Sequence, residues 1–371
     1  KNQLCSLPIY VYNSMLRLSY FPSTWEHSVI IMISKPNKPK HLTSSYRPIS
    51  LLPTFAKLFE KLILHRISSL IDQQNILPKS QFGFRRKHNT TQQIHRIVDK
   101  ISSFFESKQF CPAVFLDISQ AFDRVWHDGL LFKLKHFLPS PYFLLIKSYL
   151  NNRSFSVRHK NEFSTIQKIK AGVPQGSDLS PILYNIYTSD MPTFNQTLLA
   201  TFADDTAIFA SNNDSNTASQ NLQLHLNLIE SWANNWKIKI NDNKSAQVNF
   251  SIKKKECPSL KFNNKPIPLH QSTKYLGITL DKRLTWADHT KNKRKQLNSR
   301  LHLLRPLLKS KINLKNKILI YKSIIRPIWT YGIQIWGPAK PANIRPIQAF
   351  QSISFQTLNR CSVVYHKFSS P

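Results

Sequence analysis

The spacing of apolar residues predicts a strand followed by a helix near residue 117. Ala113–Leu116 form an apolar run of strand length that ends at Asp117. Ser119–Trp126 then places its apolar residues on one side of a predicted helix, so this carboxylate lies at a strand-to-helix junction. Before this unit, helix-like stretches alternate with basic loops. One loop contains Pro36 and Pro39 and cannot be a helix interior.

A second acidic position lies between two further predicted strands. Leu198–Ala203 and Thr206–Ala210 flank Asp204 and Asp205, which places the acidic pair at a hairpin bend. An aspartate pair also makes a good turn, and taken alone that is the simpler interpretation. The apolar residues on both sides weaken it, because charges embedded in buried strands are costly without a metal or a partner.

The remaining pattern predicts three helical regions. Ser180 is expected to be the N-cap of one helix, with Pro181 at its first position. Apolar residues recur at helical spacing over 222–236, whereas 237–250 is extended and broken by turns. From about residue 281 the chain becomes helical and basic. This order of strands and helices predicts an α+β fold with a split βαβ sheet.

Composition adds a polyanionic partner to this picture. The 371 residues are 41% apolar, enough for two or three cores, and 52 Lys and Arg face 19 acidic residues, a net charge of +33. No apolar run reaches the roughly 18 residues of a membrane span, and no signal peptide is recognisable, so nucleic acid is favoured over a membrane.

The four cysteines and the first residue allow two further interpretations. Cys5, Cys111, Cys257 and Cys361 are scattered singly, so neither a metal site nor a disulfide is predicted, and a reducing intracellular compartment fits. The chain begins at Lys1 and opens directly into an apolar periodic stretch, which suggests a piece of a longer polypeptide.

Carboxylates on neighbouring strands are suited to nucleotidyl transfer. That reaction uses two metal ions roughly 4 Å apart, held by hard oxygen ligands. Asp204 and Asp205 follow Asp117 by 87 and 88 positions, and adjacent strands of one sheet would bring all three together.

Six short runs occur in the order of the motifs of reverse transcriptases and resemble those of non-LTR (LINE-type) retrotransposons, particularly the jockey-like group. The similarity covers most of residues 20–337. The runs are YRPISLL (46–52), QFGFR (81–85), FLDISQAFD (115–123), GVPQGSDLSP (172–181), FADD (202–205) and YLG (275–277).

The resemblance implies a right-hand polymerase with fingers at 1–110, a palm at 111–280 that includes part of the fingers at about 130–168, and a helical thumb and C-terminal connection at 281–371. It implies an RNA-directed DNA polymerase that extends a primer on an RNA template by target-primed reverse transcription. Two Mg²⁺ ions, or Mn²⁺, would be cofactors, and an RNA template, a DNA primer and deoxynucleoside triphosphates would be partners. A separate endonuclease domain upstream is expected, with integration in the nucleus and RNA–protein assembly in the cytoplasm.

The resemblance also assigns residues to the catalytic centre. Asp117, Asp204 and Asp205 would be the metal ligands. Phe122 would be an aromatic gate that excludes a ribose 2′-hydroxyl, although a core residue of a helix is the alternative. The loop beside the nascent base pair would contain Gln175 and Gly176, which would equally suit a plain turn.

Basic residues are assigned to the nucleotide. Arg47 precedes a proline, which aims its side chain, and with Lys35 and Lys38 it would clamp the triphosphate; a solvated surface arginine is equally acceptable. Lys244 resembles the motif D lysine that would protonate pyrophosphate.

Further residues are assigned to the primer and template. The primer grip would be Tyr275, Leu276 and Gly277, where a plain hairpin is the alternative. The duplex would be contacted by Arg85 and by the thumb cations Lys291, Lys293, Arg294 and Lys295.

Two departures from the family pattern bear on activity and length. Asp178 occupies a position that is often apolar, which adds a carboxylate near the active centre. The segment after Gly337 lacks the tryptophan-containing stretch and cysteine-rich tail expected of jockey-like proteins, which suggests truncation or decay.

Two rival functions follow from these considerations. An inactive remnant of an element could retain nucleic-acid binding alone, although the intact aspartates oppose this. A viral RNA-dependent RNA polymerase is disfavoured, because Phe122 would obstruct ribonucleotides.

Overall fold

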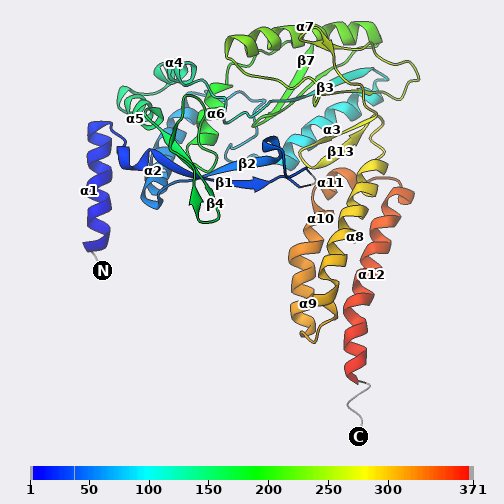
Figure 1. The fold of residues 1–371 in the computed structure, drawn as a ribbon. Coiled ribbons are helices and arrows are strands. Elements are labelled where there is room, and N and C mark those ends of the chain that lie inside the picture. Colours follow the sequence, from blue (N-terminus) through cyan, green and yellow to red (C-terminus); the bar gives the residue numbers. More distant parts are fainter. Residues whose placement is uncertain (1–2, 37, 367–371) are drawn as a thin grey trace.

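The computed structural model describes residues 3–36 and 38–366, and for 3–6 and 357–366 the backbone alone. Figure 1 shows two mixed layers of sheet and helix side by side, with a bundle of helices hanging below one of them. The two layers are called here the finger region and the palm, and the bundle is called the thumb.

The palm is a four-stranded antiparallel sheet in the order β7-β8-β3-β9. The long connection from β3 to β7 ends in helix α6, and helix α7 connects β8 to β9, so β8 lies between β3 and β7. This is the predicted split βαβ arrangement. Its elements are β3 (Cys111–Asp117), α6 (Ser180–Tyr187), β7 (Thr197–Phe202), β8 (Asp205–Ala210), α7 (Ser215–Asn235) and β9 (Ala246–Phe250).

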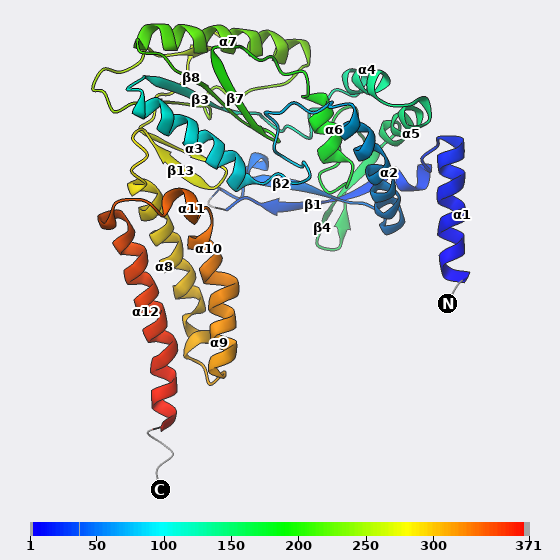
Figure 2. The ribbon, with the colours of Figure 1, turned by 180° about the vertical axis from the view of Figure 1, so that it is seen from behind.

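Both faces of the palm sheet are buried, which explains why β3 is apolar throughout. Val114 and Leu116 point into a core shared with α6 and α7. Ala113 and Phe115 point to the other face, against α3 (Thr90–Glu106) and the thumb. Figure 2 shows α3 crossing this second face, on the side of the sheet opposite α7.

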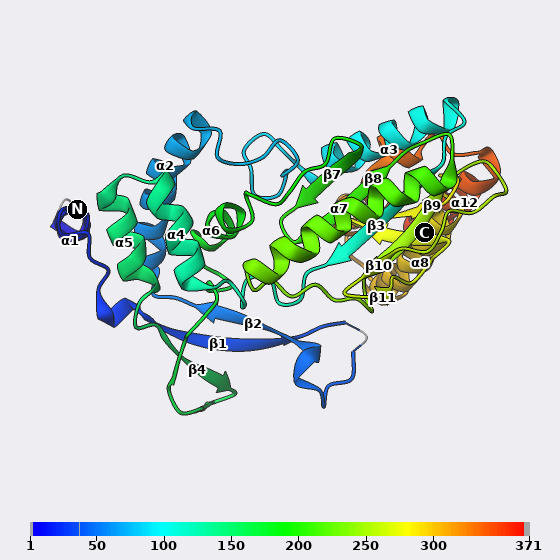
Figure 3. The same ribbon diagram turned by 90° about the horizontal axis from the view of Figure 1, so that it is seen from above.

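The finger region combines segments from both sides of β3 in the sequence. In its sheet, β1 pairs with β2 in antiparallel and with β4 in parallel orientation, so the chain returns to the fingers after entering the palm (Figure 3). The strands are β1 (His27–Ser34), β2 (Tyr46–Leu51), β4 (Ser154–His159), β5 (Glu162–Phe163) and β6 (Gln167–Lys168). The helices are α1 (Gln3–Leu18), η1 (Ser23–Trp25), η2 (Thr43–Ser45), α2 (Thr54–Gln73), α4 (His127–Phe137) and α5 (Ser140–Leu150).

A core shared with the palm sheet holds the thumb in place. Two hairpins, β10–β11 and β12–β13, precede the thumb, and Tyr275 and Ile278 from the second belong to the same core as the thumb residues Leu297 and Trp336. The elements are β10 (Lys261–Phe262), β11 (Lys265–Pro266), β12 (Ser272–Tyr275), β13 (Ile278–Asp281), α8 (Ala287–Lys309), α9 (Leu314–Ile320), the π-helical η3 (Tyr321–Ile325), α10 (Arg326–Thr330), α11 (Ile333–Trp336) and α12 (Pro341–His366). Within the described residues, no helix has the length and apolar character needed to cross a membrane.

The predicted helix over Ser119–Trp126 is wrong. These residues form turns, and the next helix, α4, begins only at His127. The carbonyls of Phe122 and Val125 accept hydrogen bonds from the amides of residues 173 and 172, and Gln120 has a positive φ of 52°. Long-range hydrogen bonds therefore replace helical ones here.

The predicted N-cap of α6 is one residue off. Ser180 is the first helical residue, and Leu179 occupies the N-cap position. The cap is supplied by Ser177, whose hydroxyl accepts the N–H groups of Leu179 and Ser180 at 3.1 and 3.3 Å. The free amides at the helix start are thus bonded to an earlier serine.

Candidate active site

Three aspartates meet at one end of the palm sheet. Asp117 ends β3 and is the direct cross-strand partner of Asp205, the first residue of β8. Paired residues on antiparallel strands have Cα atoms about 4.5–5.5 Å apart. Asp204 lies in the two-residue turn that joins β7 to β8, since Phe202 already pairs with Asp205. The antiparallel register therefore brings together the carboxylates that lie 87 and 88 positions apart.

Burial and crowding make the carboxylates of Asp204 and Asp205 harder to ionise. Asp205 is solvent-accessible but densely surrounded by protein, and this desolvation, with repulsion from Asp204 and Asp117, raises its pKa to about 6. The pKa of Asp204 is also raised, first by burial and then by Asp117, while a backbone hydrogen bond acts in the opposite direction. A nearby cation would relieve this repulsion.

The β7–β8 turn is supported by a segment of the finger region. The side-chain oxygen of Gln81 accepts the N–H groups of Ala203 and Gly83 at 2.9 and 2.8 Å. Gly83 approaches so closely that a Cβ there would lie 2.1 Å from the backbone nitrogen of Ala203. Gln93 adds hydrogen bonds from its amide to the carbonyls of Ser80 and Thr201, at 3.0 and 2.9 Å.

The sequence did not single out Gln81, Gly83 and Gln93 as supports of the catalytic turn. The run QFGFR is one of the six motif-like runs, and its glycine is one of only seven in the chain. That scarcity was the available signal, but nothing local indicated which backbone this glycine approaches.

Lys244 lies beside the first aspartate. Its ammonium group is 3.7 Å from the Asp117 carboxylate, and both side chains are partly exposed, so the pair is a weak one. The turn that contains Lys244 is held by the amide of Asn241, which donates to the carbonyl of Asp117 at 2.8 Å.

Phe122 lies in the turns after β3, half-buried among aromatic rings. It stacks on Tyr184 of α6, with ring centroids 5.0 Å apart, and its edge meets Phe84 at 6.2 Å. The alternative role in a helical core does not apply in its original form, because residue 122 is not in a helix.

The loop 172–180 joins the fingers to the palm. Gln175 donates from its side chain to the Asp123 carboxylate at 2.9 Å, and its carbonyl accepts the amide of Ser50 in β2 at 2.7 Å. Gly176 has a φ of +127°, and a Cβ there would lie 2.6 Å from the Ser50 carbonyl. Only glycine suits this conformation and contact. Asp123 ends the run FLDISQAFD, and its sequence position alone indicates no role.

The predicted nucleotide clamp lies on the β1–β2 hairpin. Arg47 and Lys38 are exposed. Lys35 instead donates to the Ser44 carbonyl at 2.8 Å, and its charge opposes the burial that raises the pKa of Asp123. Of these three cations, Lys35 is the one whose charge acts on Asp123, the partner of Gln175.

The predicted primer grip is the two-residue turn of the β12–β13 hairpin. Leu276 and Gly277 both have positive φ, 45° and 83°, which is typical of a tight hairpin turn. Tyr275 is buried and packs on Phe115 of β3. Tyr331 from the thumb donates to the Leu276 carbonyl at 2.7 Å, so the turn is fixed from both sides.

Comparisons with known proteins bear on this arrangement. The family model described as reverse transcriptase (RNA-dependent DNA polymerase) matches residues 33–280. The chain belongs to the reverse transcriptase family. The resemblance drawn from the six motifs is confirmed.

Relatives and a solved structure agree with the family. The chain is 44% identical to the probable RNA-directed DNA polymerase from transposon X-element and 41% to that from mobile element jockey, both of Drosophila melanogaster, over 95% of its own length. It spans 39% of the length of each relative. Apo telomerase from Candida tropicalis shares the fold at 14% identity, with a TM-score of 0.50 over 91% of this chain and 63% of that one.

Reverse transcriptases generally use divalent metal ions, and the three aspartates offer hard oxygen donors suited to them. Among the described residues, no three acidic, histidine or cysteine side chains converge as a ready metal site. The donor chemistry and the mutual repulsion of Asp117, Asp204 and Asp205 nevertheless fit divalent cations.

The thumb cations of this reverse transcriptase differ in exposure. Lys291 and Lys295 are exposed on α8. Lys293 is buried with its ammonium 5.5 Å from the Tyr331 ring centroid, and the Arg294 guanidinium lies 5.1 Å from the Phe350 ring centroid. The four cations are consequently not equally free to contact a duplex.

Other predicted residues are held by backbone contacts. Arg85 donates to the Pro78 carbonyl at 3.2 Å. The backbone amide of Asp178 donates to the Glu60 carboxylate at 2.8 Å. Cys111 and Cys257 are buried free thiols, whereas Cys5 and Cys361 lie outside the residues whose side chains are described.

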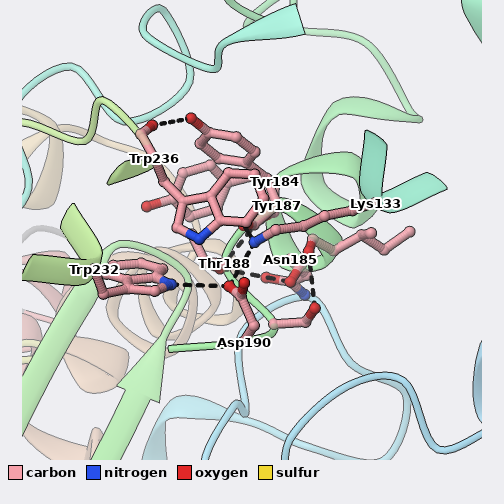
Figure 4. Close-up of polar contacts among 10 residues, drawn as sticks. Lys133, Tyr184, Asn185, Tyr187, Thr188, Asp190, Trp232 and Trp236 are labelled. Atoms are coloured by element: carbon pink, nitrogen blue, oxygen red, sulfur yellow. Dashed lines mark hydrogen bonds and ion pairs between the residues drawn. The ribbon is translucent and has the colours of Figure 1, made fainter. Parts of the chain in front are cut away.

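A polar cluster beside α6 joins helix α4 of the finger region to two helices of the palm (Figure 4). The buried ammonium of Lys133 in α4 contacts the Asp190 carboxylate at 2.5 Å and lies 3.6 Å from the Trp236 ring centroid. Trp232 of α7 donates to the same carboxylate at 2.9 Å, and Lys133 also donates to the Tyr187 carbonyl of α6. These contacts join α4, α6 and α7 to one another and do not involve Asp117, Asp204 or Asp205.

Proposed function

We propose that this chain catalyses RNA-directed DNA synthesis as the polymerase part of a longer non-LTR retrotransposon protein. It would add deoxynucleotides to a primer 3′ end annealed to an RNA template. The observation that carries the proposal is the meeting of Asp117, Asp204 and Asp205 at one end of the palm sheet. The curated relatives, which bear the name RNA-directed DNA polymerase, support the same reaction.

Two Mg²⁺ ions, or Mn²⁺, are the proposed cofactors, and Asp117, Asp204 and Asp205 would hold them. When bound, such ions activate the attacking hydroxyl and steady the leaving group. Burial, together with repulsion from Asp204 and Asp117, raises the pKa of Asp205, and a bound cation would offset that repulsion. The rigid β7–β8 turn, held by Gln81, would keep its carboxylates in place without reorganisation.

Nucleotide selection is assigned to the residues around the loop 172–180. Phe122, which lies five residues after Asp117, would exclude the ribose 2′-hydroxyl, and Gln175 and Gly176 would border the nascent base pair. A triphosphate would be contacted by the cations Arg47, Lys35 and Lys38. Lys244, 3.7 Å from Asp117, would donate a proton to pyrophosphate.

Nucleic acid would lie between the palm and the thumb. Tyr275, Leu276 and Gly277 would support the primer end, and Arg85, Lys291 and Lys295 would contact template or duplex. Target cleavage would require a separate endonuclease domain, with integration in the nucleus and assembly in the cytoplasm. The net charge of +33 supports the choice of a polyanionic partner.

The test is primer extension on an RNA template with deoxynucleotides, with and without a chelator. We expect Asp204→Asn to reduce synthesis to background while template–primer affinity stays near the parent's, because a neutral amide is a much weaker ligand for hard cations than a carboxylate. Asp99→Asn, the same change on an exposed face of α3, should leave both unchanged. Extension by Asp204→Asn at a rate near the parent's would overturn the ligand assignment.

A further inference from the structure

A buried carboxylate outside every recognised motif faces the loop 172–180. Glu60 lies on the apolar side of α2 among Ala56, Phe59 and Ile63, and 1% of its surface is exposed. One of its oxygens accepts the Ser177 hydroxyl at 2.7 Å. Because burying a carboxylate is costly, its place in an otherwise apolar helix face calls for a compensating role.

The same serine joins three segments of the chain. The Ser177 hydroxyl accepts a hydrogen bond from Tyr149 of α5 at 2.8 Å, and Glu60 also accepts the backbone amide of Asp178 at 2.8 Å. Arg153 is fully buried, 4.7 Å from the Tyr149 ring centroid. Burial raises the pKa of Glu60, while its hydrogen bonds to Ser177 and Asp178 and the charge of Arg153 act in the opposite direction. Helices α2 and α5 thus hold the second half of the loop.

The first half of the loop carries the proposed nucleotide contacts. Val173 donates its amide to the Phe122 carbonyl at 2.8 Å, and Gln175 is bonded to Asp123 and to Ser50. Only residue 176 separates Gln175 from the serine held by Glu60. A shift of Ser177 would therefore be transmitted to Gln175 and to the turn that contains Phe122.

We propose that Glu60 is a positioning residue that fixes the loop 172–180 and thereby sets deoxynucleotide affinity and selectivity. This inference rests on the proposed polymerase function and extends it to a residue on the finger helix α2. Glu60 acts through Ser177 and Asp178 and does not itself touch the substrate. A purely structural role would instead consist of balancing the charge of Arg153.

Two substitutions separate these roles. Glu60→Gln and Glu60→Leu both remove the carboxyl group that interacts electrostatically with Arg153, so both are expected to lower Tm. Only glutamine keeps an oxygen that can accept from Ser177 and Asp178. A positioning role therefore predicts rescue by glutamine, whereas charge balance predicts equal defects in the two variants.

Steady-state extension on an RNA template should show the difference in KM. For Glu60→Leu we expect the deoxynucleotide KM to rise about tenfold or more, the factor associated with losing a hydrogen bond to a charged group. The kcat should change less than KM, and discrimination against a mismatched nucleotide should fall. Glu60→Gln should stay within about threefold of the parent in KM. Parental KM for Glu60→Leu, or equal KM shifts in both variants, would overturn the proposal.

A control is available in helix α7, away from the loop 172–180. His225 of α7 is fully buried and hydrogen-bonded to Thr197 and to the Pro192 carbonyl at 2.7 and 2.9 Å, without a contact to the loop. His225→Leu should lower Tm but leave the deoxynucleotide KM unchanged. A KM rise in this control as large as that of Glu60→Leu would attribute the effect to lost stability and overturn the proposal.

Hydrogen exchange of the amides of residues 177–180 gives a readout that needs no catalysis. Exchange should be faster in Glu60→Leu than in Glu60→Gln, because only leucine releases the Asp178 amide. If the parent makes no DNA, the polymerase function fails while this measurement still reports on positioning. Equal exchange in the two variants would refute positioning whatever the activity.

Discussion

Substituting Gly83 by alanine should displace the catalytic turn without altering any catalytic side chain. The added Cβ would lie 2.1 Å from the Ala203 nitrogen and 2.8 Å from the Phe202 carbonyl carbon, both backbone atoms that cannot rotate away. Residue 83 and the Ala203 backbone would have to move apart by about 1 Å to reach the shortest contacts that real Cβ atoms show. The turn that moves is the one that carries Asp204.

The size of the effect follows from that displacement. A misplacement of about 1 Å in a reacting geometry can cost on the order of a hundredfold in rate, which corresponds to roughly 3 kcal/mol of activation free energy. Single-turnover extension at saturating nucleotide and template–primer would measure it, since binding is then removed from the rate. We expect a loss of about a hundredfold for Gly83→Ala.

A steric control is available in α4. A Cβ on Gly129 would lie 2.6 Å from a ring carbon of Trp126, a clash with a side chain rather than with the backbone of the β7–β8 turn. Gly129→Ala should lower Tm with a rate within about threefold of the parent. A Gly83→Ala rate near the parent's, or an equal loss in the two variants, would refute the reasoning.

Three other predictions concern the sugar, the duplex and pH. Phe122→Val should raise ribonucleotide incorporation by about a hundredfold, equivalent to roughly 3 kcal/mol of lost repulsion, while most deoxynucleotide use is retained. Single-turnover rates with matched dNTP and rNTP measure this change. If ribonucleotide incorporation does not rise, Phe122 is a packing residue and not a gate. Replacing Lys291 and Lys295 by alanine should reduce the salt dependence of template–primer affinity by about 0.7–0.9 in logarithmic slope per lost phosphate contact, and an unchanged slope would locate the duplex elsewhere. Burial, and secondarily Lys293, lowers the pKa of His289 to about 4. As pH falls below about 6.5, this histidine is therefore protonated in the unfolded chain but stays neutral in the folded one. The free energy of unfolding should decline by about 2 kcal/mol near pH 5 for this reason. His289→Gln should lose this component of the pH dependence of Tm, and an identical pH profile in parent and variant would contradict it.

The fold and the aspartate positions were predictable from the sequence because they depend on local spacing and chain order. The continuous apolar run before Asp117 and the two runs around Asp204 predict strands from their own residues, without reference to the rest of the chain. Once the order of strands and crossover helices is known, few sheet topologies remain. Motif order then identified the family, and the family model agrees.

The conformations that depend on distant partners were not predictable in this way. Residues 119–126 have helical apolar spacing, but hydrogen bonds to residues 172 and 173 hold them in turns. From the sequence, Lys293 is one of several equivalent thumb cations, but in the fold it is buried against the Tyr331 ring. In the sequence Glu60 resembles any glutamate on a helix. Its hydrogen-bond partners, Ser177 and Asp178, lie more than a hundred residues away along the chain. Periodicity reports which side of an element is apolar, whereas the partner of a buried polar group is set by the packing of segments that are remote in sequence.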